Sequence, residues 1–138
     1  MIYLILYSIF IAYSISAGII EGYLYFYKYS NNYTFINTNL HPLYDCQRLI
    51  VLIGLCMCIY TMPFWIILLF ALSCCLQFPW THDGFYYLCR HELKHSDYPK
   101  GFFDNSTEER WDDFKLWMRI VFLLLSIIII SFLSYYIR

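Results

Sequence analysis

The fold is decided by the stretch LIVLIGLCMCIYTMPFWIILLFALSCCLQFPW, which occupies residues 49–80 and contains no Asp, Glu, Lys or Arg. As one α-helix it would be about 48 Å long, well beyond the roughly 30 Å of a bilayer's hydrocarbon core. Pro63 lies near its middle, and proline is tolerated in the first turn of a helix but disrupts the interior. We therefore predict a helical hairpin with arms over residues 46–60 and 63–79.

The length of these arms leaves alternatives open. Each arm would be about 24 Å long, slightly short of a full crossing. The arms therefore either cross a locally thinned bilayer or form a re-entrant hairpin buried against other helices. A single kinked and tilted helix is the rival interpretation.

Two further uncharged runs, Met1–Ile20 and Ile120–Ile137, flank the central stretch. Inside lipid the backbone polar groups must be paired within the segment, so these runs predict membrane helices over residues 2–20 and 116–137. The first run could be a signal peptide instead, but its start carries no Lys or Arg, which favours an uncleaved helix. A capping-box pattern from Ser106 to Glu109 predicts that the last helix begins near Thr107.

The composition agrees with a membrane protein. Of 138 residues, 61% are hydrophobic and 14% are charged, against about 45–50% and about 25% in a typical soluble domain. A disordered chain would need low hydrophobicity and high net charge, and a net charge of −1 gives no basic footprint for nucleic acid. We predict an all-α, polytopic membrane protein with one domain over residues 1–138, three to four membrane segments, a central hairpin at Pro63 and a long C-terminal helix.

The distribution of positive charge predicts the orientation in the membrane. If the central stretch folds back, the polar loops over residues 21–45 and 80–115 lie on the same side. Of the nine Lys and Arg residues, all except Arg138 lie in these loops or beside them. The positive-inside rule places such loops in the cytoplasm and both termini on the opposite side.

The segment His91-Glu92-Leu93-Lys94-His95 matches the H-E-x-x-H pattern of zincins. On a helix, His91 and His95 share a face and can bind zinc, and Glu92 would activate the metal-bound water as general base. Lys94 places a cation inside the motif, and Pro99 ends any helix soon afterwards. The other interpretation is a solvated charged turn beside the membrane, so no cofactor is expected and zinc is the alternative.

His82 and Asp83 form a second candidate site. They follow Pro79, which we expect to end the preceding helix, and Gly84 permits a turn with positive φ. The functional interpretation is a pair for proton transfer, in which Asp83 holds His82 in one tautomer. The structural interpretation is a capped turn among aromatic residues at the level of the lipid headgroups.

A third set, a polar network, comprises Glu21, His41, Asp45, Arg48 and Arg90. Spacings of four and three place His41, Asp45 and Arg48 on one face of the hairpin's first helix. Glu21 lies at membrane depth if the first helix continues beyond residue 20, and an ionisable group there is a functional hypothesis by default. Arg48 or Arg90 is its expected partner, and an interfacial Glu21 is the alternative.

Residues 82–87 read H-D-G-F-Y-Y, and residues 98–103 read Y-P-K-G-F-F. Together with Arg90, these motifs resemble a segment of short, uncharacterised bacterial or phage-encoded multi-pass membrane proteins. The resemblance covers less than a third of the chain and implies that residues 82–103 are the signature region, but it brings no activity. It lowers the weight of the zincin interpretation, because the resembling residues bracket His91–His95 rather than include them.

The leading functional hypothesis is a non-catalytic subunit or helix-packing interaction protein that contacts membrane lipid and forms a homo-oligomer or a membrane protein complex. The chain is too small to enclose a roomy pocket alone, and its helices carry small residues that permit close approach. These residues are Ser14, Ser16, Ala17, Gly18, Gly54, Ala71 and Ser73. The alternatives are a membrane metallohydrolase using the His91-Glu92-x-x-His95 segment, and an oligomeric pore or ion-handling element built on Glu21, His82 and Asp83.

Overall fold

The computed structural model describes residues 2–30, 41–94, 98–104 and 115–136. Its elements are α1 (Ile2–Ser30), α2 (His41–Met57), α3 (Phe64–Leu93), the short 3-10 helix η2 (Gly101–Phe103) and α4 (Leu116–Tyr136). The described residues contain no strand, which confirms the predicted all-α class. The predicted helix start near Thr107, with its capping box, lies outside the described residues.

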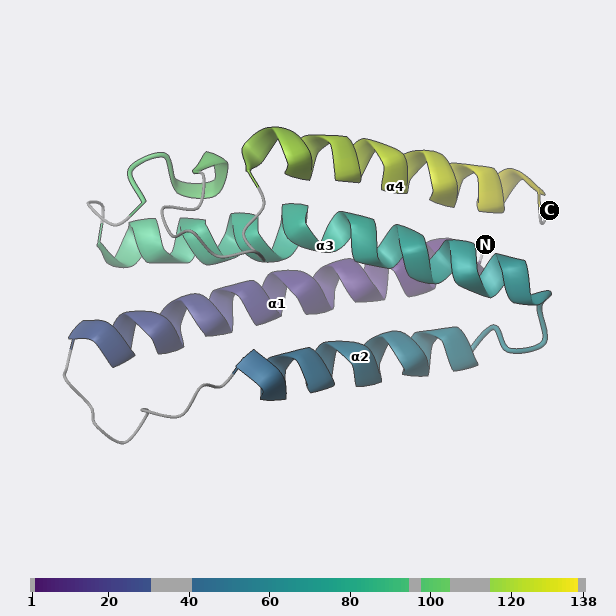
Figure 1. The fold of residues 1–138 in the computed structure, drawn as a ribbon, viewed down its shortest axis with the longest axis horizontal. Coiled ribbons are helices and arrows are strands. Elements are labelled where there is room, and N and C mark those ends of the chain that lie inside the picture. The colour runs from purple at the N-terminus through teal and green to yellow at the C-terminus, as the bar shows by residue number, and fades with distance from the viewer. Residues whose placement is uncertain (1, 31–40, 95–97, 105–114, 137–138) are drawn as a thin grey trace.

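The four long helices lie roughly side by side along the long axis of the molecule, in the order α4, α3, α1, α2 (Figure 1). α1 and α3 run in one direction, whereas α2 and α4 run in the other (Figure 1). The chain folds back between Met57 and Phe64, with Pro63 directly before α3, so the predicted hairpin is confirmed. Both chain termini lie at the end of this turn, which we call the terminal end; α1 and α3 finish at the opposite end, which we call the loop end.

The bounds of three helices differ from those predicted. α1 continues ten residues past Ile20 to Ser30, and α2 begins at His41 and ends at Met57 rather than covering 46–60. α3 continues through Pro79 to Leu93, so the prediction that Pro79 ends the helix is wrong, and residues 80–93 of the predicted loop 80–115 are helical. Proline is tolerated inside membrane helices. Here α3 is also held by α4, because the Arg119 guanidinium donates to the Pro79 carbonyl at 3.1 Å.

Among the described residues, three helices are long and apolar enough to cross a membrane: α3, α4 and the Ile2–Tyr27 part of α1. α4, with 21 residues, is about 31 Å long and matches the hydrocarbon thickness. α1 and α3 project beyond the start of α4 at the loop end (Figure 1). α2 is shorter, with 17 residues, and lies beside α1 and α3.

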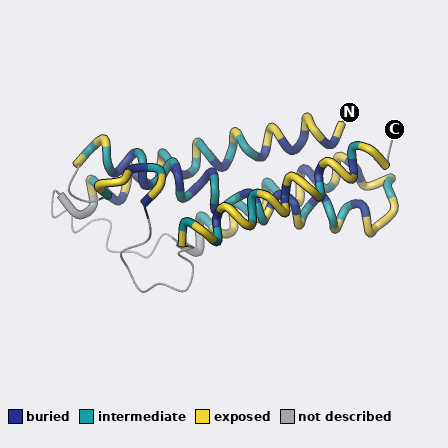
Figure 2. The backbone as a smooth tube through the Cα atoms, turned by 90° about the horizontal axis from the view of Figure 1, so that it is seen from above, coloured by how far each residue is buried: buried dark blue, intermediate teal, exposed yellow. Residues whose placement is uncertain are grey.

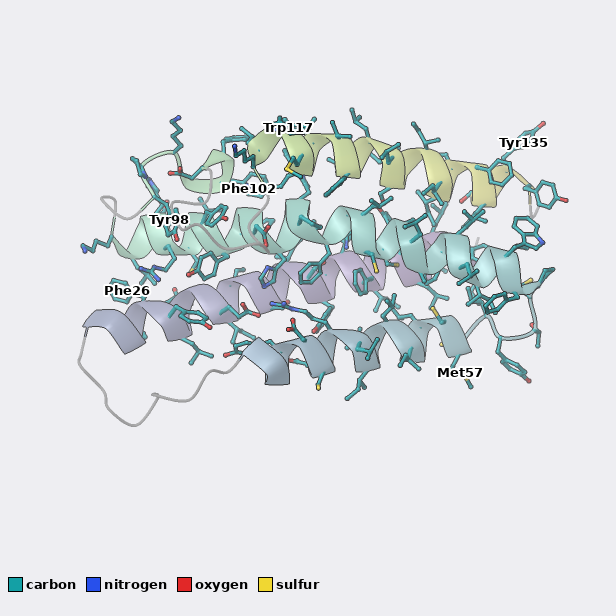
Figure 3. The ribbon with its side chains drawn as sticks, in the orientation of Figure 1. Phe26, Met57, Tyr98, Phe102, Trp117 and Tyr135 are labelled. Atoms are coloured by element: carbon teal, nitrogen blue, oxygen red, sulfur yellow. The ribbon has the colours of Figure 1, made fainter. Side chains whose placement is uncertain are left out.

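The surface is apolar and much of the interior is polar, which is typical of a protein surrounded by lipid. Exposed residues run along the outward sides of the helices, and buried residues lie where the helices meet (Figure 2). Aromatic side chains are exposed at both ends of α4: Trp117 near its start, and Tyr135 near its end at the terminal end of the bundle (Figure 3). Such a pair of aromatic belts is expected at the two membrane interfaces.

An apolar core fills the terminal half of the bundle. It combines buried side chains of all four helices: Tyr3, Leu6, Tyr7, Phe10, Leu55, Ile66, Phe70, Cys74, Ile130 and Leu133, together with Ile59 from the turn after α2. Towards the loop end, α1 and α3 approach each other through glycine. A Cβ atom on Gly18 would lie 2.2 Å from the carbonyl oxygen of His82, and one on Gly22 would lie 2.9 Å from the Cβ of Cys89. These two glycines therefore let α1 contact α3 closely.

We expect Gly18→Ala to lower the free energy of unfolding by about 1–3 kcal/mol, the usual cost of forcing an extra group into a packed interface. The matched control is Gly54→Ala, because nothing lies within 4 Å of a Cβ at that position of α2. It should be neutral or stabilise by at most about 1 kcal/mol through better helix propensity. Denaturation in detergent micelles, followed by circular dichroism, measures both, and equal losses would contradict the close approach at Gly18.

Candidate functional site

Glu21 of α1, Arg48 of α2 and His82 of α3 meet near the loop end of the bundle. Glu21 is 4% exposed and His82 is 6% exposed, so both lie inside the protein. The Arg48 guanidinium donates from Nη2 to Oε1 of Glu21, an ion pair that joins α2 to α1. We call Glu21, Asp45, Arg48, His82 and Asp83 the polar cluster.

The His82 imidazole lies between two carboxylates. Its Nδ1 is 2.9 Å from Oδ1 of Asp83, and its Nε2 is 3.3 Å from Oε1 of Glu21. Nε2 also lies 3.1 Å from Nη2 of Arg48. Each neutral tautomer therefore has partners: with the proton on Nδ1, His82 donates to Asp83 and accepts from Arg48, and with the proton on Nε2 it donates to Glu21.

Arg48 connects the interior of the polar cluster with its surface. Its Nη1 donates to Oδ1 of Asp45 at 2.9 Å, and the Asp45 side chain is 68% exposed. Its guanidinium also lies over the Phe78 ring at 4.9 Å, and the same ring stacks on the imidazole of His82 at 4.6 Å. The cluster is thus enclosed on one side by an aromatic ring and reaches the exterior along α2.

The local sequence explains why these side chains meet. Gly18 precedes Glu21 by about one helical turn and lies against the backbone of His82, so the close approach of α1 and α3 brings Glu21 within reach of the imidazole. Asp45 and Arg48 are three residues apart on α2, a spacing that places both on one face. The start of α4 shows how deep the cluster lies along the bundle. Arg119, in the first turn of α4, bonds to the carbonyls of Pro79 and Trp80, which directly precede Thr81 and His82 in α3. The cluster therefore lies at about the depth where α4 begins, near the loop-end boundary of the hydrocarbon layer that α4 spans.

The structure brings together Glu21, Asp45 and Arg48 of the predicted network and joins them to His82 and Asp83, which lie on a helix and not in a turn. Arg90 lies two turns further along α3, where it is buried. Its Nη1 donates to the Tyr86 hydroxyl at 3.4 Å, and its guanidinium lies 5.9 Å from the centre of the Tyr98 ring. His41 begins α2, but its side chain lies outside the described part of the chain.

The H-E-x-x-H segment lies at the end of α3. His91 is within hydrogen-bond distance of the Tyr98 carbonyl, with Nδ1 at 2.9 Å, and Glu92 is exposed. The helix ends at Leu93, and His95 falls outside the described residues. Among the residues described, no three His, Cys, Asp or Glu side chains are grouped to hold a metal ion. The zinc site stays a prediction.

Arg119 is a buried cation whose role the sequence did not indicate. It is 0% exposed and donates to four backbone carbonyls, those of Pro79 and Asp104 at 3.1 and 3.2 Å and those of Phe102 and Trp80 at 3.1 and 3.3 Å. The rings of Trp80, Tyr87 and Phe102 surround it at 5.4–5.6 Å. The one sequence feature that could have indicated its burial is the spacing of seven residues between Arg119, Ser126 and Leu133, which places all three on one face of α4. Ser126 and Leu133 are also fully buried.

Residues 84–87 of α3 and the segment over residues 98–104 pack against each other around this arginine. A Cβ on Gly84 would lie 2.3 Å from the Phe102 ring, so the ring can pack against α3 only because residue 84 has no side chain. The rings of Phe85 and Phe102 meet edge to face at 5.5 Å, and those of Tyr87 and Tyr98 stack at 4.8 Å. Residues 98–104 therefore cover the loop-end half of α3.

Comparison with protein families, with curated proteins and with solved structures finds no match for this chain. The resemblance carried by residues 82–87 and 98–103 therefore stays a prediction.

The ion pair between α1 and α2 is tested by a double-mutant cycle. Glu21→Gln and Arg48→Gln should each cost about 3 kcal/mol of unfolding free energy, because each leaves an unpaired charge in a mostly buried place. The double variant should cost at least about 1 kcal/mol less than the sum. Asp45→Asn, which removes an exposed pair, is the control and should cost less than about 1 kcal/mol. Strict additivity of the two buried changes would rule out a direct interaction.

We expect Arg119→Lys to release residues 98–104 from α3. A lysine ammonium is a compact point charge and cannot reach four carbonyls that a planar guanidinium spans. Hydrogen exchange at the amides of Gly101 and Asp104, which are bonded within this segment, should become faster. Lys115→Ala, an exposed neighbour, should leave these amides unchanged, and protected amides in the Arg119 variant would contradict the role.

Proposed function

We propose that this chain is a small multi-pass membrane protein that handles protons at the polar cluster. The observation that carries the proposal is the His82 ring, with one nitrogen facing Asp83 and the other facing Glu21. Chains of Asp, Glu and His inside membrane proteins commonly serve as proton relays. Such groups are costly to place at membrane depth, so their retention calls for a functional reason.

The geometry suits a proton transfer through the imidazole. A proton that arrives on the Asp83 carboxylate passes to the bare Nδ1 of His82, while the proton already on Nε2 passes to the Glu21 carboxylate. Asp83 is then ionised again, Glu21 is neutral, and His82 has exchanged one tautomer for the other. Every proton is accounted for, and the imidazole carries no net charge before or after the step.

Arg48 would set the resting state of this relay. Its Nη2 faces both Oε1 of Glu21 and Nε2 of His82, so it favours an ionised Glu21, the form that accepts the proton at the end of the relay. When Glu21 accepts a proton, the ion pair with Arg48 weakens. Proton transfer is thereby coupled to the contact that joins α2 to α1.

The orientation belongs to the same proposal. Four of the nine Lys and Arg residues lie in the connection over residues 94–115, and Lys28, Arg48, Arg90 and Arg119 lie in the loop-end parts of the helices. The positive-inside rule therefore places the loop end in the cytoplasm, with both termini on the opposite side. The polar cluster would then lie at the cytoplasmic boundary of the membrane, where protons are supplied from bulk water.

A second candidate function is a helix-packing subunit that associates with itself or with another membrane protein. The supporting observation is Gly54, which has open space around it on a face of α2 where Ile50, Ile53 and Met57 are exposed. Gly18 does not serve this purpose, because it is occupied by the contact between α1 and α3. A helix glycine with no neighbour inside the protein is suited to close contact with a partner helix.

Proton handling is tested with purified protein in liposomes that contain a pH-sensitive dye. Under an imposed pH gradient, Glu21→Gln and His82→Gln should slow proton entry by about 10²-fold, the lower end of what a positioned acid or base contributes. Glu92→Gln is the matched control, since it makes the same chemical change at an exposed position of α3. A wild-type rate equal to that of empty liposomes would refute proton handling.

A further inference from the structure

The buried polar side chains do not end at the polar cluster. On α1, Tyr7, Ser14 and Glu21 recur every seven residues, and all three are buried. An interval of seven residues is about two helical turns, so these side chains lie on one face, the face that contacts α3 and α4. We call the contact surface between this face of α1 and the helices α3 and α4 the seam. Polar groups thus recur along the seam, at membrane depths where apolar side chains would be enough to pack the helices together.

The first layer below the polar cluster consists of Ser14, Gln77 and Thr81. The Thr81 hydroxyl lies 2.9 Å from the Ser14 hydroxyl and 2.9 Å from Oε1 of Gln77. The Gln77 amide nitrogen lies 3.2 Å from the Ser14 hydroxyl. Thr81 directly precedes His82 in α3, so this hydrogen-bonded triangle adjoins the imidazole relay.

The second layer, about one turn deeper, joins α1 to α4 and α3. The hydroxyl of Ser126 donates to the Ser73 carbonyl at 2.7 Å, so the Tyr7 hydroxyl, at 2.5 Å, donates to Ser126. The hydroxyl protons of Tyr7 and Ser126 therefore both point towards the Ser73 carbonyl. One turn further towards the terminal end, the buried Tyr3 hydroxyl has no hydrogen-bond partner among the described residues.

The layers together extend across most of the membrane. From Tyr3 to Glu21 along α1 is about 27 Å, compared with about 30 Å of hydrocarbon. On α3, Thr81, Gln77 and Ser73 follow one another at intervals of about one helical turn, roughly 5.4 Å, a gap that one bridging water with two hydrogen bonds spans. Helix packing alone does not require a hydroxyl at every layer, since buried hydroxyls are favourable only when paired.

We propose that this seam is a proton path that leads from the polar cluster to the terminal end, through Thr81, Ser14, Ser126 and Tyr7. The inference rests on the proposed function, because the polar cluster supplies the proton. To pass a proton towards the terminal end, the Ser14 and Ser126 hydroxyls first rotate away from the carbonyls of Phe10 and Ser73 to which they donate, and the Tyr7 hydroxyl rotates away from Ser126. Each hydroxyl oxygen then accepts a proton on one side and releases its own on the other, and bridging waters do the same. One proton enters at Glu21, one leaves beyond Tyr3, and no side chain is changed at the end.

The test uses the full chain in liposomes of neutral lipid, with the proton flux driven by a pH gradient. Tyr7→Phe and Ser14→Ala should each lower the flux at least tenfold, because each removes a hydroxyl while keeping most of the side chain's volume. The matched controls are Ser8→Ala and Ser16→Ala on the exposed face of α1, whose hydroxyls bond only to their own helix. These controls should keep the wild-type flux. Each variant's thermal unfolding is compared with wild type, and Ser14→Thr, which restores a hydroxyl, should recover the flux.

The outcomes separate the path from the cluster. Flux that Glu21→Gln abolishes, but that Tyr7→Phe and Ser14→Ala leave intact in folded protein, overturns the path and leaves proton handling at the cluster standing. Equal losses in the Ser14→Ala and Ser16→Ala variants also overturn the path. Absence of flux in the wild-type protein overturns both.

Discussion

The ion pair between Arg48 and Glu21 joins α2 to α1 and is the interaction on which the polar cluster depends. A charge near the hydrocarbon must be paired, because leaving one buried ion without its partner costs several kcal/mol. α2 contributes Leu55 to the apolar core at the terminal end, whereas Leu49, Ile50 and Ile53 are exposed. Arg48 therefore joins α2 to α1 and α3 by polar contacts: its guanidinium bonds to Glu21 and faces the imidazole of His82.

Close packing and charge pairing depend on each other at the loop end. Gly18 lets α1 approach the backbone of His82, and this approach places Glu21 beside the imidazole. On the other side of α3, Gly84 makes room for Phe102, and Arg119 holds that segment through backbone carbonyls. Two glycines and two arginines therefore organise the polar half of a bundle whose other half is held by apolar contacts.

The sequence predicted the class, the fold-back at Pro63 and the membrane location, because a long charge-free stretch has few folded solutions in lipid. It underestimated α1 and α3, because Glu21 and Pro79 were interpreted as ends of helices. Glu21 pairs with Arg48, and the Pro79 carbonyl accepts a hydrogen bond from Arg119. Both partners are far away in the chain, and local patterns carry no information about them. The meeting of Glu21 with Arg48 was predictable from the cost of an isolated charge, whereas its meeting with His82 depended on α3 continuing through Pro79.

Nitrogen-15 NMR of the His82 imidazole, in protein labelled at histidine and held in lipid nanodiscs, tests the central arrangement most directly. We expect both ring nitrogens to be hydrogen-bonded and slow to exchange with water. Glu21→Gln should shift the Nε2 resonance and leave Nδ1 bound to Asp83. An imidazole that exchanges freely with water and does not respond to the change at Glu21 would contradict the bridging role of His82.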